Sequence, residues 1–286
     1  MRKGVVYSQN FLRDKRLVSR LINESSLNKN DTVYEIGAGQ GIITEKLIKV
    51  CKEVLAFEID TALYDKLQKQ FSNVPSLKIY PDDFLSHPLP KSDYKIFSNI
   101  PFNITADIIK KLTQTQNPPK DSYLIVQKEA AVKYTSKSQA SVLIKPWFDL
   151  TVVHQFKRSD FSPKPKVDSV LLRLRKKESP FVTISNKQVY EDFITYAFTQ
   201  GLQKVFTKLQ FSKLAKGLDF PSTSTPTQLD FNQWLGLFNF FLTNMDNQKQ
   251  KVIEGFAKKL LEQQSNLQKI HRTRTDKDWK KLRSFK

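Results

Sequence analysis

Short apolar runs alternate with stretches of helical periodicity over the first 180 residues of the chain. Each run is four to six residues long and ends close to glycine or polar residues, as buried strands do. Helical spacing follows in 43–48, 62–67 and 106–112. This alternation predicts an α/β fold built on a parallel, doubly wound sheet. The expected strands are 32–36, 53–58, 77–80, 94–98, 122–126 and 170–174.

The pattern changes after Pro180, where strand-like runs disappear. Apolar residues at helical spacing in 190–198, 205–211 and 232–242 predict a small helical domain. We therefore expect a first domain over 1–180, a helical RNA-binding domain over 181–246 and a basic tail over 247–286. The tail carries twelve Lys and Arg against four acidic residues, a net charge of +8. One amphipathic helix is expected in it, with the remainder disordered unless bound; its apolar positions are Val252, Phe256, Leu260 and Leu261.

The formal net charge of the whole chain is +19. Such an excess predicts binding to a polyanion, although a lysine-rich composition alone is the alternative. No apolar run approaches the ~18 residues that span a membrane, and the first ten residues lack a signal-peptide core. Cys51 is the single cysteine, so no intramolecular disulfide forms, and the three histidines have no metal-ligand spacing. We expect a cytoplasmic protein that binds nucleic acid, with no membrane and no metal.

Three of the eight glycines lie at 37, 39 and 41, directly after the first expected strand. Glycine allows a tight turn and close approach of the backbone to a ligand. The spacing is GxGxG rather than the GxGxxG of dinucleotide folds, and by itself it is a weak signal. This turn is predicted to bind a nucleotide.

Two acidic residues follow the next strands. Glu58 ends the second strand, where a carboxylate accepts hydrogen bonds from ribose hydroxyls. Asp83 follows the third strand and is expected to receive an adenine amino group; Asp82 is the alternative register. Glu35 is expected to be structural and to orient the glycine turn. NAD is the rival ligand, but the third-strand acid and the loop at 99–102 favour S-adenosylmethionine.

The loop Asn99-Ile100-Pro101-Phe102 is typical of enzymes that methylate an exocyclic amino nitrogen. The lone pair of an aromatic amine is delocalised into the ring, so the enzyme must draw the nitrogen towards tetrahedral geometry. The Asn99 side-chain oxygen and the Ile100 carbonyl are the expected acceptors for its two hydrogens. Pro101 stiffens the turn, and Phe102 offers a face on which the base stacks.

A target base inside folded RNA must leave its stack to reach such a loop. Phe161, in a Pro- and Lys-rich segment, is the candidate for the second stacking face. Core packing is the alternative for this residue. The lysines and arginines that follow it either bind phosphates or form a solvated basic surface.

The order of these motifs resembles the ribosomal RNA adenine N6-methyltransferase family, from about residue 7 to 175 and more loosely to 242. The resemblance implies a Rossmann-like S-adenosylmethionine-dependent methyltransferase domain with a small C-terminal helical domain. The residues that carry it are Ser8-Gln9-Asn10-Phe11-Leu12, the glycine segment, Glu58-Ile59-Asp60, Asp83-Phe84-Leu85, residues 99–105 and residues 161–169. By the same resemblance, the cofactor-binding residues are Asn10, Leu12, Gly37, Gly39, Glu58, Ile59, Asp83, Phe84 and Asn99.

Two branches of that family differ in their rRNA target. The Asn-Ile-Pro loop and residues 231–238 resemble the Erm enzymes, which act on 23S rRNA. The housekeeping enzymes, which act on 16S rRNA, usually have Asn-Leu-Pro-Tyr. The Erm resemblance implies N6-methylation of an adenine in the peptidyl transferase loop and resistance to macrolides, lincosamides and streptogramin B. A 16S dimethyltransferase and a non-catalytic RNA-binding factor are the alternatives. A monomer is the default expectation for the oligomeric state. Whether one or two methyl groups are added does not follow from the sequence.

Overall fold

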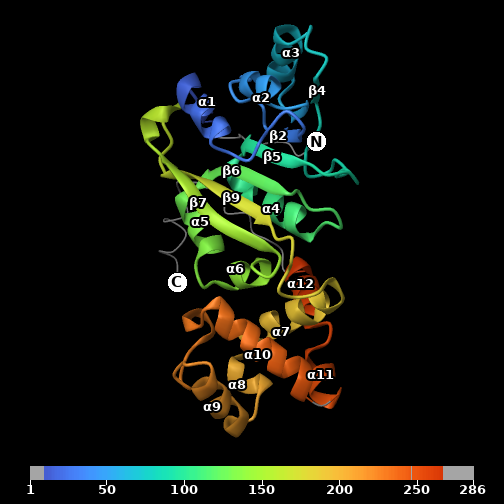
Figure 1. Ribbon diagram of the computed structural model, residues 1–286, viewed down its shortest axis with the longest axis vertical. Helices are drawn as coiled ribbons and strands as arrows, with labels where there is room; N and C mark the ends of the chain where they lie inside the picture. Colours follow the sequence, from blue (N-terminus) through green and yellow to red (C-terminus); the bar gives the residue numbers. More distant parts are fainter. Residues whose placement is uncertain (1–9, 246, 267–286) are drawn as a thin grey trace, which may run out of the picture. The chain divides into compact units, whose positions relative to one another are not determined.

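The computed structural model describes residues 10–245 and 247–266 of the 286-residue chain. The described residues form two compact units, and each unit is built from separate parts of the sequence (Figure 1). The first unit contains 10–184 and 227–236, and the second contains 185–226, 237–245 and 247–266. The returning segment is held in the first unit by Lys137, whose Nζ donates to the Gln228 carbonyl at 2.7 Å. Residues 1–9 and 267–286, with the Ser8-Gln9 motif and the end of the basic tail, lie outside the described residues.

The first unit contains a seven-stranded sheet in the order β4-β3-β2-β5-β6-β9-β7. The first five strands in this order run parallel, whereas β9 is antiparallel to both of its neighbours. This arrangement confirms the predicted α/β fold class. The strands are β2 (Thr32–Ile36), β3 (Glu53–Phe57), β4 (Leu77–Tyr80), β5 (Lys95–Asn99), β6 (Asp121–Gln127), β7 (Phe148–Phe156) and β9 (Ser169–Lys176).

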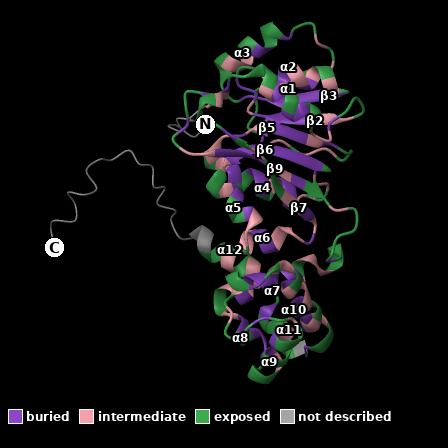
Figure 2. Cartoon of the chain, turned by 60° about the vertical axis from the view of Figure 1, so that its left-hand side comes forward, coloured by how far each residue is buried: buried purple, intermediate pink, exposed green. Residues whose placement is uncertain are grey.

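Helices cover both faces of this sheet because successive strand residues point to opposite sides. Val33 packs in the cluster that includes Val18 and Leu47, whereas Tyr34 packs in the cluster of Ile108 and Leu112. Figure 2 shows the resulting buried strands in purple, with exposed residues in green along the helices. One face carries α1 (Lys15–Asn23), α2 (Thr44–Val50) and α3 (Thr61–Gln70); the other carries α4 (Thr105–Gln114), α5 (Lys128–Thr135) and α6 (Gln139–Ile144).

The carboxyl ends of four neighbouring parallel strands carry the predicted site motifs. The glycine turn follows β2, Glu58 follows β3, Asp82 and Asp83 follow β4, and Asn99 ends β5. Because β4, β3, β2 and β5 are adjacent, these motifs meet at one edge of the sheet.

A two-stranded sheet joins the N-terminal arm to a later segment. β1 (Phe11–Leu12) pairs antiparallel with β8 (Phe161–Ser162), and the Arg13 amide donates to the Asp160 carbonyl at 2.9 Å. A short 3-10 turn, η2 (Arg158–Asp160), precedes β8. The arm is thereby held at a fixed place beside the large sheet.

The second unit is helical, with an aromatic core. Phe193 contacts the rings of Phe238 and Phe241 at centroid distances of 5.6 and 5.0 Å. The predicted helix over 205–211 is wrong, because Phe206 is extended and the Thr207 hydroxyl caps a new helix in a capping box with Gln210. The helices are α7 (Lys187–Gln200), α8 (Leu202–Val205), α9 (Lys208–Gly217), α10 (Phe231–Asn244), which begins in the first unit, α11 (Asn247–Ile253) and α12 (Phe256–Asn266).

The last two helices belong to the second unit and are fastened by Asp192 of α7. Its carboxylate is 2 % exposed and accepts hydrogen bonds from the amides of Gly255 and Ala257 at 2.9 and 2.8 Å. The single amphipathic helix expected here is wrong, because Gly255 has φ +72° and separates α11 from α12. A left-handed glycine ends one helix, and the buried carboxylate caps the next.

All six predicted strands are present, but β7 was not predicted. It lies at the edge of the sheet, and its residues 151–153 and 155 are exposed, so it lacks the apolar run of a buried strand. None of the helices in the described part of the chain has the length and apolar character needed to cross a membrane.

Candidate active site

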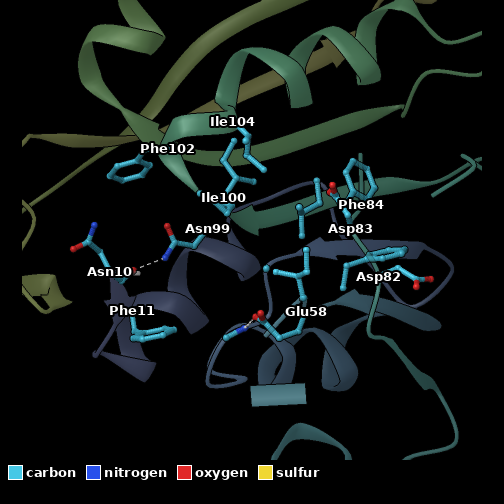
Figure 3. A pocket seen from close by; sticks show the side chains of 16 residues that line it. Asn10, Phe11, Glu58, Asp82, Asp83, Phe84, Asn99, Ile100, Phe102 and Ile104 are labelled. Carbon is cyan, nitrogen blue, oxygen red and sulfur yellow. Dashed lines mark hydrogen bonds between the residues drawn. The ribbon is translucent and has the colours of Figure 1, made fainter. Parts of the chain in front are cut away.

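A pocket opens at the carboxyl edge of the sheet, where the motif-bearing loops meet (Figure 3). Every predicted site residue lines it except Leu12 and Phe161. The roles of the lining residues in binding and catalysis stay predictions. The lining residues are Asn10, Phe11, Ile36, Gly37, Gly39, Phe57, Glu58, Ile59, Asp82, Asp83, Phe84, Asn99, Ile100, Pro101, Phe102 and Ile104.

The glycine turn has a backbone that requires glycine. Gly37 and Gly39 have φ values of +72° and +57°, in the left-handed region. A Cβ atom on Gly39 would lie 2.7 Å from Cε1 of Phe11. Because glycine has no side chain, the turn leaves room for the Phe11 ring, and the main-chain groups of Gly37 and Gly39 lie at the pocket wall.

Glu58 ties the glycine turn to the end of β3. Its Oε2 accepts the Gly39 amide at 2.7 Å, and its Oε1 accepts the Asp60 amide at 2.9 Å. The residue is 4 % exposed, and burial raises the pKa of its carboxyl. Each carboxylate oxygen has a further lone pair, so the group can also accept hydrogen bonds from a ligand in the pocket.

Glu35 lies behind the turn rather than in the pocket. Its Oε2 accepts a hydrogen bond from the Thr44 hydroxyl at 2.6 Å, which links β2 to the first residue of α2. The side chain is buried, and this burial raises its pKa to about 8. The position agrees with the structural role expected from the sequence.

Both carboxylates of the loop after β4 line the pocket. Asp83 Oδ1 accepts the Leu85 amide at 2.9 Å, which fixes this side chain within its own turn. The Asp82 carboxylate lies 3.7 Å from Nδ1 of His87. Asp83 is thus held by its own turn, and its role as the acceptor of an adenine amino group stays a prediction.

The Asn99 side chain has a defined orientation. Its Nδ2 donates to the main-chain carbonyl of Asn10 at 2.8 Å. Figure 3 shows the amide nitrogen turned towards Asn10 and the oxygen turned away from it. Ile100, which follows it, is 2 % exposed and its side chain is anchored in the core. Pro101 then fixes the turn with φ −60°. Because Nδ2 is the atom bonded to Asn10, the Asn99 side-chain oxygen remains available as an acceptor.

The two predicted stacking residues lie in different environments. Phe102 is half-buried and lines the pocket at the start of η1 (Phe102–Ile104), so its ring can offer a face. The structure corrects the prediction for Phe161, which is 1 % exposed and contacts Phe156 at a centroid distance of 5.4 Å. A ring enclosed in the core has no face for a base.

The side chain of Leu12 is also buried in the core and does not line the pocket, and its role in binding the cofactor stays a prediction. It is the register partner of Phe161 in the β1–β8 pair, and both side chains belong to one core cluster. Neighbouring strand residues point to opposite sides, so Phe11 points away from that core and lines the pocket instead. Sequence reasoning missed Phe11, although the alternation of the arm was the available signal. Ile36, Phe57 and Ile104 were also missed, because each lies in an apolar stretch that reads as core.

No group of acidic, histidine and cysteine side chains within 10–245 and 247–266 is arranged to hold a metal ion. Of the acidic residues of the pocket, Glu58 and Asp83 accept hydrogen bonds from main-chain amides.

The part of the chain that contains the pocket matches a known protein family. Residues 2–241 match the family described as "Ribosomal RNA adenine dimethylase". The chain is 34 % identical to an rRNA adenine N-6-methyltransferase of Lysinibacillus sphaericus over 236 residues, 82 % of this chain and 95 % of that protein. It is 31 % identical to one of Escherichia coli over 245 residues, 85 % of this chain and 98 % of that protein.

Two solved structures share the fold over most of the chain. The 23S rRNA methyltransferase ErmE superposes with a TM-score of 0.75 and 26 % identity, covering 82 % of this chain and all of that one. A dimethyladenosine transferase from Plasmodium falciparum superposes with a TM-score of 0.66 and 24 % identity, covering 84 % of this chain and 98 % of that one. At 24 % identity, the similarity to the Plasmodium falciparum structure shows a shared fold only.

Proposed function

The chain belongs to the ribosomal RNA adenine dimethylase family, and we propose that it methylates N6 of an adenine in the peptidyl transferase loop of 23S rRNA. The methyl donor is S-adenosylmethionine, and the consequence is resistance to macrolides, lincosamides and streptogramin B. The observation that carries the proposal is the fixed Asn99 amide beside a half-buried Phe102 in one pocket.

The pocket suits S-adenosylmethionine. The left-handed glycine turn brings main-chain groups to the wall, and the Glu58 carboxylate has lone pairs for ribose hydroxyls. Asp83, with Phe84 beside it, would hold the adenine, while Asn10, Ile59 and Asn99 would complete the cofactor site. When bound, S-adenosylmethionine supplies an electrophilic methyl group carried by a positively charged sulfur.

The catalytic loop would act on the amino group of the target base. Asn99 Oδ1 and the Ile100 carbonyl would accept its two hydrogens and draw the nitrogen out of conjugation with the ring. The main-chain carbonyl of Asn10 accepts a hydrogen bond from Asn99 Nδ2 and so prevents the Asn99 amide from turning. Phe102 would stack on the base, a contact that contributes ~1–3 kcal/mol. Most of the acceleration would come from this positioning.

The 23S target is supported by two observations. The loop at 99–102 has the Asn-Ile-Pro form of the Erm enzymes, and the ErmE chain is covered in full. The alternative is a 16S rRNA dimethyltransferase. We further propose that the protein is a cytoplasmic monomer. Its helical unit would contribute to RNA binding through exposed lysines, which include Lys204, Lys208, Lys213 and Lys216.

Mass spectrometry of rRNA tests the target directly. The protein is expressed in a susceptible bacterium, with Asn99→Ala as the matched inactive control, and 23S and 16S rRNA are analysed. Added mass on one adenine of the 23S peptidyl transferase loop, with raised macrolide tolerance, supports the proposal and counts the methyl groups. Added mass near the 16S 3′ end replaces it with the alternative. Unchanged RNA in both subunits overturns it in favour of a non-catalytic RNA-binding factor.

A further inference from the structure

The ammonium group of Lys111 is enclosed by main-chain carbonyls of the loop that follows β4. Lys111 Nζ donates to the carbonyls of Phe84 and Leu85 at 2.7 and 2.9 Å, and also to that of His87. It lies 5.0 Å from the centroid of the Phe84 ring. A lysine ammonium has three N–H donors, so this single loop can engage all of them.

The same loop forms one wall of the pocket. Asp82, Asp83 and Phe84 line it, and Phe84 packs edge-on against Phe57 at 5.3 Å. From within, the loop is closed by Asp83, whose carboxylate accepts the Leu85 amide and whose carbonyl accepts the Ser86 amide, both at 2.9 Å. From outside, the carbonyls of residues 84, 85 and 87 converge on Lys111. Asp83 therefore holds the loop through hydrogen bonds within it, whereas Lys111 holds it through the carbonyls on its outer side.

Lys111 also connects the loop to the catalytic segment. It lies on α4, which begins directly after η1, and the Thr105 hydroxyl at the start of α4 donates to the Phe102 carbonyl at 3.0 Å. The apolar face of α4, formed by Ile108, Ile109 and Leu112, is fully packed in the core. A rigid helix thus carries the target-base loop at one end and the ammonium near the other.

The lysine is partly withdrawn from water to make these contacts. Its side chain is half-buried, and burial lowers its pKa, an effect that the nearby Asp83 carboxylate opposes. A lysine that only decorated the helix would extend into solvent, as its neighbour Lys110 does. Withdrawing an ammonium from water is unfavourable unless hydrogen bonds compensate, and here the acceptors belong to the loop whose residues 82–84 form the pocket wall.

We propose that Lys111 is a positioning residue for the cofactor site, which holds the Asp83–Phe84 wall in the geometry that receives the adenine of S-adenosylmethionine. The inference rests on the proposed function, since it assumes that this wall binds the cofactor. It assigns Lys111 no contact with the cofactor itself. Its expected signature is weaker cofactor binding with RNA binding unchanged.

The test uses the full chain and S-adenosylhomocysteine as the probe. Lys111→Met keeps most of the aliphatic stem and removes the ammonium, and Lys111→Arg keeps the charge on a planar group that cannot serve three converging carbonyls. Lys110→Met, one position away on the exposed side of α4, is the matched control. Calorimetry gives Kd for the probe, filter binding gives Kd for RNA, and thermal unfolding without ligand reports the fold.

Lys111→Met is expected to raise the Kd for S-adenosylhomocysteine and the KM for S-adenosylmethionine by roughly tenfold or more, because hydrogen bonds to a charged group are lost. The RNA affinity of Lys111→Met is expected to stay within about twofold of wild type. Lys110→Met is expected to do so for both ligands, because the exposed Lys110 side chain donates no hydrogen bond to this loop. Lys111→Arg should show a smaller loss in the same direction, which keeps the inference testable if Lys111→Met does not fold.

A folded Lys111→Met or Lys111→Arg protein with wild-type affinity for the probe overturns the inference and leaves the proposed function intact. Equal losses of RNA and probe affinity also overturn it, since they indicate a general structural role. Wild-type protein that binds no probe overturns the proposed function itself, and with it the inference.

Discussion

The side chain of Asn99 is oriented by the main chain of Asn10, through a 2.8 Å hydrogen bond from Nδ2 to the carbonyl oxygen. The partner is a backbone atom, so no side-chain substitution at position 10 removes the acceptor directly. The bond joins the end of β5 to the N-terminal arm, two segments 89 residues apart. The arm thereby determines which atom of the amide faces the pocket.

Asn99→Ala should therefore abolish most methyl transfer while leaving RNA binding nearly unchanged. We expect a loss in single-turnover rate of about 10²-fold or more, by analogy with the removal of one preorganised polar group from an active site. Asn99→Asp should be as slow, because a carboxylate cannot donate to the Asn10 carbonyl. Transfer of labelled methyl groups and filter binding measure the two quantities, and parallel losses in both would count against a catalytic role.

Substitution of the two phenylalanines should separate binding from stability. Phe161→Ala is expected to lower the free energy of unfolding by ~3–5 kcal/mol, because it empties a fully buried site. Phe102→Ala should leave stability within about 1 kcal/mol, as at a partly exposed position, and should weaken binding of the target base instead. Urea unfolding and KM for RNA give the comparison. A stable Phe161→Ala variant with impaired RNA binding would restore Phe161 as a stacking residue.

Gly39 and Phe11 should behave as a coupled pair. Gly39→Ala places a Cβ 2.7 Å from the Phe11 ring and holds alanine at a left-handed φ, so we expect weaker S-adenosylhomocysteine binding. Phe11→Ala removes the clash but not the backbone strain, which costs roughly 1–2 kcal/mol. The double variant should thus lose less affinity than the sum of the single variants. Strictly additive losses in calorimetry would show that the ring and the turn act independently.

Stability should fall as pH rises through the range set by Glu35. Burial raises the pKa of this carboxyl from 4.5 to about 8, so between these values the folded protein holds a proton that the unfolded chain has released. The free energy of unfolding then decreases with pH across this window and levels off above it. Glu35→Gln keeps an acceptor for the Thr44 hydroxyl and cannot ionise, so it should flatten this part of the profile. Urea unfolding at pH 5 to 9 measures it; an unchanged slope would assign the dependence to other groups.

Local sequence patterns were sufficient where neighbouring residues determine the outcome. The ends of the strands near residues 36, 57 and 99 were readable to within one residue, because the apolar runs stop at the glycine turn, at Glu58 and at Asn99. Adjacent parallel strands then bring these loops together. For the same reason the motifs predicted to bind the cofactor and to act in catalysis line one pocket.

Pairings between distant segments could not be read in this way. The core positions of Leu12 and Phe161 follow from the β1–β8 register, which joins residues about 150 positions apart. The contacts of Lys111 depend on how α4 lies against the loop after β4. Residues 151–153 and 155 of the edge strand β7 are exposed, so its sequence lacks the apolar run that predicts a buried strand. Each of these features is decided by tertiary packing rather than by local preference.

The interleaved composition of the two units determines the order in which the newly made chain can be completed. Residues 227–236 return to the first unit, and Gly255 and Ala257 provide the amides that satisfy Asp192 in the second. During synthesis, the first unit must wait for a segment that follows residues 185–226 of the second unit. The second unit in turn stays incomplete until the start of α12 has left the ribosomal tunnel. A chain that stops between residues 193 and 254 would therefore contain the Asp192 carboxylate but neither of the amides that donate hydrogen bonds to it.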